Sequence, residues 1–141
     1  MALGIDFEQL VNAIGDAIVV ADVEGRITLW PSAAERLFGY SAAEAIGQSL
    51  DLIIPERLRE RHWAGYRRSM ASGDTRYGGD LLRVPATRKD GAALSIAFTV
   101  ALLRGVRNEL TGIVAVIRDD TQRFADERLL RKRLAELEAK P

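Results

Sequence analysis

The chain has 141 residues, with 20 basic and 20 acidic side chains, no cysteine and a hydrophobic content of 48%. These values are typical of one folded domain, and they exclude intrinsic disorder, disulfides, thiolate metal sites, cysteine nucleophiles and cysteinyl–flavin photochemistry. The balanced charge argues against nucleic acid and an anionic membrane as partners. Neither a long apolar run nor a leader pattern is present, which predicts a cytoplasmic protein.

The first third of the chain predicts a helix, a hairpin and a second helix. Residues 5–14 space their apolar side chains at helical intervals, so an amphipathic helix is expected there. Two β-rich runs separated by Glu24 and Gly25 predict a β-hairpin. Ser32 and Glu35 have the spacing of a capping box, which predicts that Ser32 caps the short helix that follows.

Two further helices are expected in the middle of the chain. Ser41 and Glu44 repeat the capping-box spacing at the start of another short helix. A longer helix is expected over 56–71, because Gly73 follows it as a stop signal.

The second half of the chain changes to the period of strands. A strand is expected near 79–87, where Pro85 predicts either an amide position outside the ladder or a bulge. Strands are also expected over 93–103 and 110–119, and the charged segment 121–140 predicts a last helix.

This order of elements predicts an α+β fold with short helices on one face of an antiparallel sheet. The predicted boundaries are an N-terminal capping helix over 1–15, one domain over 16–119 and a signalling helix over 120–141. No P-loop, HExxH, GxGxxG or nucleophile elbow occurs in the sequence, so an enzyme is not expected.

His62 is the single histidine of the chain. Leu58, His62, Tyr66 and Met70 follow one another at intervals of four, so they share one stripe of the long helix, and His62 is expected to point inward. Two interpretations stay open. His62 is a structural histidine, bonded to a backbone carbonyl in the core or placed at the edge of a cavity. Alternatively its neutral imidazole binds a metal centre, with haem iron favoured because the chain has no second histidine or cysteine to hold zinc. Trp63, one residue off the stripe, is expected to face away, against a neighbouring helix or a partner chain.

The last helix carries Leu130, Leu134 and Leu137 at four-then-three spacing, which is typical of a short coiled-coil seam. The alternative is a helix that packs back on its own domain. We expect a parallel homodimer through residues 5–14 and 121–140, because both segments present apolar side chains that one small core cannot cover. A downstream signalling partner or effector domain is a further expectation for a helix of this kind.

Several phrases of the sequence, in this order, resemble those of PAS domains. They are AAERLFGYS, IGQ, IIPE, RKDG and IRDxT, and the similarity covers about residues 7–123. The resemblance implies a PAS fold, a five-stranded antiparallel sheet in the order 2-1-5-4-3, and a sensory role. Pro31 stands where many relatives carry an asparagine that helps to cap the next helix.

The segment from Ile53 to Gly79 is similar to the haem-binding PAS domains of oxygen-sensing histidine kinases. By that resemblance His62, eight residues before Met70, is the proximal ligand of haem b. The distal arginine of those kinases falls on Leu82, with Arg83 next to it. The cofactor pocket implied by the resemblance is lined by His62, Tyr66, Leu82, Ile96, Phe98, Val100, Ile113, Ala115 and Ile117.

Three functions are therefore compared. The first is a haem-binding sensor of a diatomic gas or of redox state. The second is a PAS module that binds another small molecule or no cofactor and serves dimerisation and signal relay. The third is a flavin-binding PAS domain, which is disfavoured because the expected pocket strands supply apolar side chains in place of flavin-binding amides.

Overall fold

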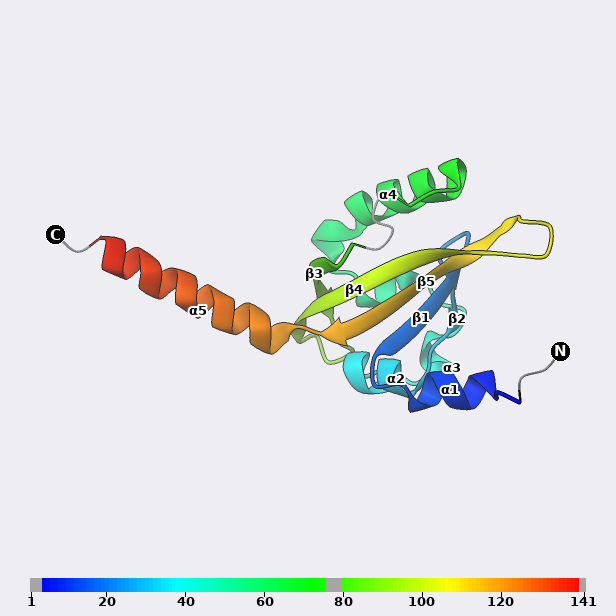
Figure 1. Ribbon diagram of the computed structural model, residues 1–141, viewed down its shortest axis with the longest axis horizontal. Helices are drawn as coiled ribbons and strands as arrows, with labels where there is room; N and C mark the ends of the chain where they lie inside the picture. The colour runs from blue at the N-terminus through cyan, green and yellow to red at the C-terminus, as the bar shows by residue number, and fades with distance from the viewer. Residues whose placement is uncertain (1–3, 76–79, 140–141) are drawn as a thin grey trace.

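The computed structural model describes residues 4–75 and 80–139 of the chain. A sheet with short helices on one face forms the body of the molecule, and the last helix projects away from it (Figure 1). The elements in chain order are α1 (Phe7–Ala13), β1 (Ala17–Asp22), β2 (Ile27–Leu29), α2 (Ser32–Phe38), α3 (Ala42–Ala45), η1 (Leu50–Ile53), η2 (Glu56–Leu58), α4 (Arg59–Ser72), β3 (Leu82–Thr87), β4 (Ala93–Arg104), β5 (Leu110–Asp119) and α5 (Thr121–Glu138).

The five strands form one antiparallel sheet in the order β2-β1-β5-β4-β3. This confirms the predicted fold class and strand order. The chain leaves the sheet after β2, forms α2, α3, η1, η2 and α4, and returns at the opposite edge with β3. The first and last strands in sequence meet at the centre of the sheet, where Ala17 lies opposite Ile117.

One face of the sheet is apolar because its side chains alternate. Ala17, Val19 and Ala21 of β1 are buried, and the residues between them are partly exposed. α2 covers this face with Ala34 and Phe38, neither of which is exposed to solvent. The hydrophobic core therefore lies between α2 and the centre of the sheet.

Trp30 and Tyr40 hold the two ends of α2 in the core. The ring of Trp30 packs on Phe38 with centroids 5.4 Å apart, and its Nε1 donates a hydrogen bond of 2.9 Å to the carbonyl of Tyr40. The buried indole thus has its polar atom satisfied, as burial of that group requires.

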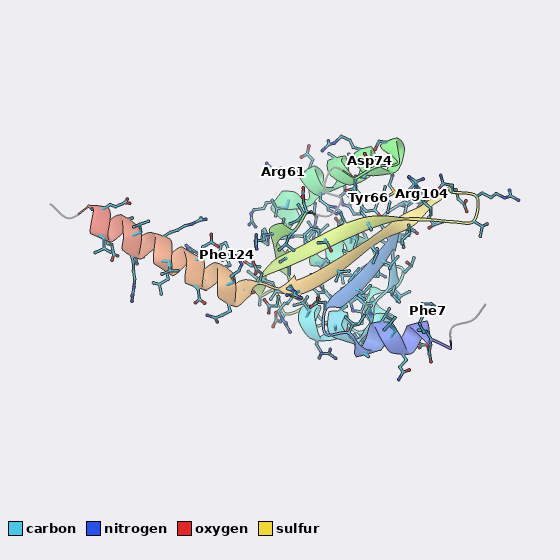
Figure 2. The ribbon with its side chains drawn as sticks, viewed as in Figure 1. Phe7, Arg61, Tyr66, Asp74, Arg104 and Phe124 are labelled. Carbon is cyan, nitrogen blue, oxygen red and sulfur yellow. The ribbon has the colours of Figure 1, made fainter. Side chains whose placement is uncertain are left out.

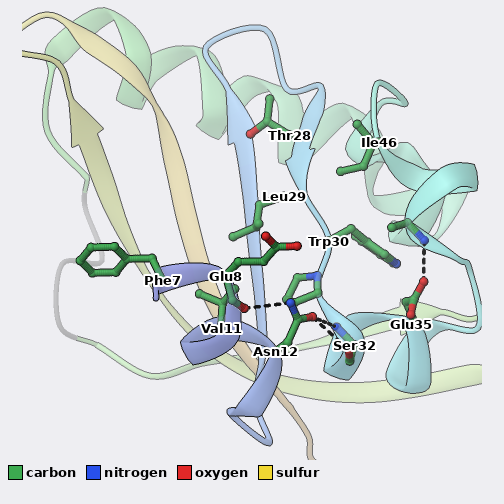
Figure 3. A pocket seen from close by; sticks show the side chains of 12 residues that line it. Phe7, Glu8, Val11, Asn12, Thr28, Leu29, Trp30, Ser32, Glu35 and Ile46 are labelled. Atoms are coloured by element: carbon green, nitrogen blue, oxygen red, sulfur yellow. Dashed lines mark hydrogen bonds between the residues drawn. The ribbon is translucent and has the colours of Figure 1, made fainter. Parts of the chain in front are cut away.

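The cap of α2 differs from the prediction. Pro31 occupies the N-cap position and makes no side-chain cap, and Ser32 is already helical. Asn12 of α1 supplies the cap instead: its Oδ1 accepts hydrogen bonds of 3.0 Å from both the N–H and the Oγ of Ser32 (Figure 3). Glu35 accepts a 2.7 Å bond from the N–H of Ala42, so it links α2 to α3 and takes no part in a capping box. The prediction that Ser32 is the cap is wrong, because a residue from another helix satisfies the first free amide.

The predictions for α3 and for the long helix are closer to the structure. Ser41 and Glu44 form both bonds of a capping box at α3. The long helix predicted over 56–71 is one 3₁₀ turn, η2, followed by α4, and Gly73 ends it in the left-handed conformation with φ of 70°.

β3 begins at Leu82, later than the predicted 79–87, whose first residue lies outside the described ranges. Pro85 lies opposite Ser95 in an uninterrupted register, so there is no bulge. The N–H of Ser95 donates to Thr121 Oγ1 and its carbonyl accepts from the N–H of Asp120. The backbone N–H and carbonyl of Ser95 thus both bond to the start of α5 and not to β3. Pro85, which has no N–H, therefore lies where β4 needs no hydrogen-bond donor.

α5 covers most of the predicted segment 121–140, and none of its residues is buried. Position 140 itself lies outside the described residues. The alternative of a helix packed back on its own domain is therefore wrong for this chain, since α5 extends from the end of the sheet (Figure 1).

Candidate functional site

His62 lies in the first half of α4 and faces inward. Its side chain is half-buried, and its Nδ1 is fully buried with no hydrogen-bond partner among the described residues. A core histidine normally bonds such an atom to a backbone carbonyl. The unpartnered nitrogen therefore disagrees with the interpretation of His62 as a satisfied core residue.

Aromatic rings surround His62 on its own helix. The ring of Trp63 meets it edge-on at 4.6 Å between centroids, and that of Tyr66 lies at 5.7 Å. Tyr66 is buried, and its Oη donates a hydrogen bond to the carbonyl of Asp22 at the end of β1. Figure 2 shows Tyr66 between α4 and the strands. This bond fixes α4 to the turn that joins β1 and β2.

Trp63 adds a second attachment to the same turn. Its Nε1 donates a 2.7 Å hydrogen bond to Oδ1 of Asp51 in η1. Its ring lies over Gly25, where an added Cβ would fall 2.2 Å from two ring carbons. The expected contact of Trp63 with a neighbouring helix agrees with its bond to η1. Its ring does not face away from the His62 stripe, however, because it also meets the ring of His62.

Burial determines the ionisation of the histidine. Loss of hydration lowers the pKa of His62 below its ordinary value, and the negative charge of Asp51 opposes this shift only in part. His62 is thus neutral at pH 7. A neutral imidazole with a free ring nitrogen is the form that binds metal ions.

The predicted strand residues share one face of the sheet. Phe98 of β4 lies opposite both Leu82 of β3 and Ile117 of β5, and Val100 lies opposite Ala115. By the alternation of each strand, Ile96 and Ile113 belong to the same face. These seven side chains form an apolar wall on the helix-covered face. Their contact with one ligand bound at His62 stays a prediction.

The two ends of that wall differ in burial. Ile96 and Ile117 are buried in the core, and Phe98 and Ala115 are partly buried against it. Leu82 and Ile113 retain more exposure. The wall therefore continues the core outward, beyond the area that α2 covers.

Arg83 lies next to Leu82 and points to the other face of the sheet. Its Nε is 3.6 Å from Oδ2 of Asp120. The position that corresponds by counting to a distal arginine is thus occupied by Leu82, and the neighbouring guanidinium is used at the start of α5.

Three arginines of α4 differ in the contacts that they make. Arg59 donates to the carbonyls of Ile54 and Asp51, at 3.1 and 3.2 Å, so it stabilises the segment before α4. Arg67 and Arg68 are exposed and form no hydrogen bond or ion pair with described residues. These two remain available to an anionic group.

The far end of α4 is attached to the β4–β5 hairpin. Nη2 of Arg104 donates a 2.6 Å hydrogen bond to the carbonyl of Gly73, and its Nη1 donates to the carbonyl of Asn108 (Figure 2). This contact joins residues 31 positions apart and corresponds to no motif of the sequence. α4 is thus held at one end by the β1–β2 turn and at the other by the β4–β5 hairpin.

Two grooves of the described surface lie elsewhere, and the first is beside α1. It has a volume of about 580 Å³ and separates α1 from β2, α2 and α3, with Phe7, Trp30 and Glu35 among its walls (Figure 3). A second groove of about 330 Å³ lies beside Asp16 and Arg118. His62 lines neither groove, so the predicted cavity around it stays a prediction. Among helices in the described ranges, none combines the length and apolar character that crossing a bilayer requires.

Comparison with known proteins adds independent information. The model of the PAS fold matches residues 5–119. The sensor protein FixL of Bradyrhizobium diazoefficiens is 33% identical over 115 residues, which is 81% of this chain and 23% of FixL. The oxygen sensor protein DosP of Escherichia coli is 27% identical over 129 residues, 92% of this chain and 16% of DosP. The chain thus spans less than a quarter of the length of either protein.

Solved structures agree with this assignment of the fold. The PAS domain of a protein from Colwellia psychrerythraea superposes with a TM-score of 0.71 and 25% identity, over 81% of this chain and 93% of that domain. An RNA-binding light-oxygen-voltage receptor gives a TM-score of 0.74 at 22% identity, over 96% of this chain and 40% of the receptor.

Proposed function

This chain belongs to the PAS family, and from that premise we propose that it is a sensor domain that binds haem b through His62 and detects a diatomic gas or a redox state. It acts without catalysis of its own, and the signal leaves through α5 to a downstream effector. The family membership supports the sensory role. The choice of haem depends on the histidine.

The observation that carries the proposal is the buried Nδ1 of His62, which has no hydrogen-bond partner among the residues that the structure describes. A buried polar atom without a hydrogen-bond partner costs free energy. Such an atom in a folded protein therefore calls for an explanation, for example a role in binding a ligand. His62 is also neutral at pH 7 and unique in the chain. These properties fit an imidazole that is held ready for a metal centre.

The remaining residues suit a large, flat, apolar ligand with acidic groups. The wall formed by β3, β4 and β5 offers aliphatic and aromatic surface. Arg67 and Arg68 offer free guanidinium groups for carboxylates. When bound, haem supplies an iron centre that responds to diatomic gases and to electrons. Leu82 keeps the wall apolar at the position where the resemblance places a distal arginine. Such a wall favours a diatomic gas that needs no charged hydrogen-bond donor.

The test is a titration of the apo-protein with haemin, followed by the Soret band. We expect a sharp band at one haemin per chain for the wild type and its loss in His62→Ala, because the metal–imidazole bond is gone. Met70→Leu is the matched control, because Met70 lies on the same stripe as His62. The substitution keeps the side-chain volume and removes the thioether, so this variant should bind haemin as the wild type does. Far-UV circular dichroism verifies that each variant is folded.

Two outcomes contradict the proposal. A His62→Ala variant with the wild-type band and stoichiometry shows that another residue holds the haem. A wild-type protein without saturable binding favours the second function, a relay module without haem. An absorption spectrum of the purified protein with flavin bands would favour the third.

We also propose a parallel homodimer through α1 and α5. Phe7 in α1 is 71% exposed, and Leu130, Leu134 and Leu137 in α5 are all more than half exposed. Apolar side chains in such rows are covered in most proteins. Sedimentation should give a dimer that Leu134→Glu dissociates, whereas Leu129→Glu, equally exposed but off the row, leaves it intact. A monomeric wild type contradicts the proposal.

A further inference from the structure

The joint between the sheet and α5 holds a buried acid for which the proposed sensor site has no use. The side chain of Asp120 is 10% exposed. Its Oδ1 accepts a 2.8 Å hydrogen bond from Nε of Arg123, and its Oδ2 accepts one of 2.8 Å from Nη2 of the same side chain. Arg83 of β3 approaches the same Oδ2 to 3.6 Å. One carboxylate thus faces two guanidinium groups, one from α5 and one from the sheet.

The backbone fixes this carboxylate in place. The N–H of Asp120 donates a 2.7 Å hydrogen bond to the carbonyl of Ser95 in β4, and Thr121 Oγ1 accepts from the N–H of Ser95. Asp119 accepts from the N–H of Thr121 and so caps the first turn of α5. Asp120 itself does not cap the helix, so its side chain is free for the two arginines.

The charges continue along α5. Arg123 also donates to Oε2 of Glu127, and Glu127 accepts a 2.7 Å bond from Arg131. Asp120, Arg123 and Glu127 lie at three- and four-residue intervals that continue to Leu130, Leu134 and Leu137. The first half of this row, from Asp120 to Glu127, is therefore charged, and its side chains bond to one another and to Arg131. The second half, from Leu130 to Leu137, is apolar.

We propose that Asp120 is a positioning residue: it joins edge strand β3, through Arg83, to the first turn of α5, through Arg123, and so sets the direction in which α5 leaves the sheet. A shift of β3 then changes the angle of α5. Leu82, the neighbour of Arg83, belongs to the apolar wall, so β3 borders the proposed ligand site. The inference on Asp120 itself needs no ligand and stands apart from the haem proposal.

Electrostatics explain why this position matters. Hydrogen bonds from Arg123, together with the charge of Arg83, hold the pKa of Asp120 below its usual range, so the carboxylate is charged at pH 7. Its loss leaves two like charges facing each other at the joint. The attraction between Arg83 and Glu127 of α5 then remains, and the backbone and Thr121 still hold the start of α5 to Ser95 of β4.

The test measures the angle of α5 in the ligand-free protein. The chain contains no cysteine, so Ala101→Cys in β4 and Ala135→Cys in α5 give two unique sites for spin labels, both exposed. Labelled chains are diluted with unlabelled ones, so that each measured distance lies within one chain. We expect Asp120→Asn and Arg83→Gln to broaden and shift the distribution of this distance, and Arg83→Lys, which keeps the charge, to restore it.

Arg128→Gln is the matched control, because Arg128 is an exposed arginine of α5 without an ion pair to described residues. Wild-type distributions in both Asp120→Asn and Arg83→Gln overturn the proposal. A change in Asp120→Asn alone overturns the connection to β3. If Asp120→Asn does not fold, Arg83→Gln decides the question by itself, since Arg83 is half exposed and its loss leaves the core intact.

Discussion

Substitution of Gly25 by alanine tests how α4 is attached beside His62. Gly25 has φ of +86° in the β1–β2 turn, and a Cβ there would fall 2.2 Å from Cη2 and Cζ3 of Trp63. Real contacts are never this short, so the indole ring must move. Its 2.7 Å hydrogen bond to Asp51 then stretches or breaks. Gly25→Ala therefore loosens the start of α4 without a change in His62.

The cost has two parts. An alanine in the left-handed region costs about 1–2 kcal/mol relative to glycine. Loss of the hydrogen bond of Trp63, which is partly exposed to water, and of its ring contacts costs about another 1–2 kcal/mol. The free energy of unfolding should thus fall by roughly 2–4 kcal/mol.

Gly47 provides the matched control. It has the same φ of +86°, but no atom lies within 4 Å of an added Cβ. Gly47→Ala should therefore cost only the backbone part, about 1–2 kcal/mol. Urea unfolding followed by far-UV circular dichroism measures both variants without use of the fluorescence of Trp63. Equal losses for the two glycines would refute the reasoning, as would an unchanged cost of Gly25→Ala in a Trp63→Ala background.

Two further predictions concern the same protein without ligand. Asn12→Ala should lower the free energy of unfolding by about 1 kcal/mol, because α2 loses its cap from another helix. Gln9→Ala is the control: Gln9 lies on α1 with no described side-chain hydrogen bond, so its loss should leave urea unfolding unchanged. Equal effects of the two substitutions would contradict the role of Asn12 as the cap. Because burial lowers the pKa of His62, the unfolded chain takes up a proton at higher pH than the folded one. The stability of the fold with a neutral, buried His62 is therefore fully present above pH 6.5, and it is lost as the pH falls below this value. Urea midpoints measured on either side of this pH should differ less in His62→Gln, and an identical dependence in both proteins would argue against the burial of His62.

The elements and the inward face of the sheet follow from local patterns. Two-residue alternation places Phe98 and Val100 on one side of β4 whatever the partner strand is, whereas the register with β5 brings Ala115 to the same face. The capping box at Ser41 depends on residues three positions apart, and the stripe of His62 on residues four apart. Interactions between residues two to four positions apart can thus be predicted from the sequence.

The contacts that orient the elements could not be predicted in this way. Asn12 caps a helix 20 residues later, and Arg104 reaches back 31 residues to Gly73. Such bonds depend on where the chain returns in space, and many other polar side chains could make them. The orientation of Trp63 likewise depends on the angle at which α4 crosses the β1–β2 turn. Helical spacing fixes the order of residues around an axis but leaves that angle free.

Each edge of the sheet carries a feature that hinders pairing with another strand. At β2, Ile27 donates from its N–H to Gln48 and accepts from the N–H of Gly47 at 2.8 Å, so the following segment already occupies that edge. At β3, the nitrogen of Pro85 points outward and has no hydrogen to donate. Extension of this sheet by a strand of a second copy, the usual route to fibrous aggregation, is therefore hindered at both edges. Helical surfaces can associate, separate and rejoin without any change in the pairing of the strands.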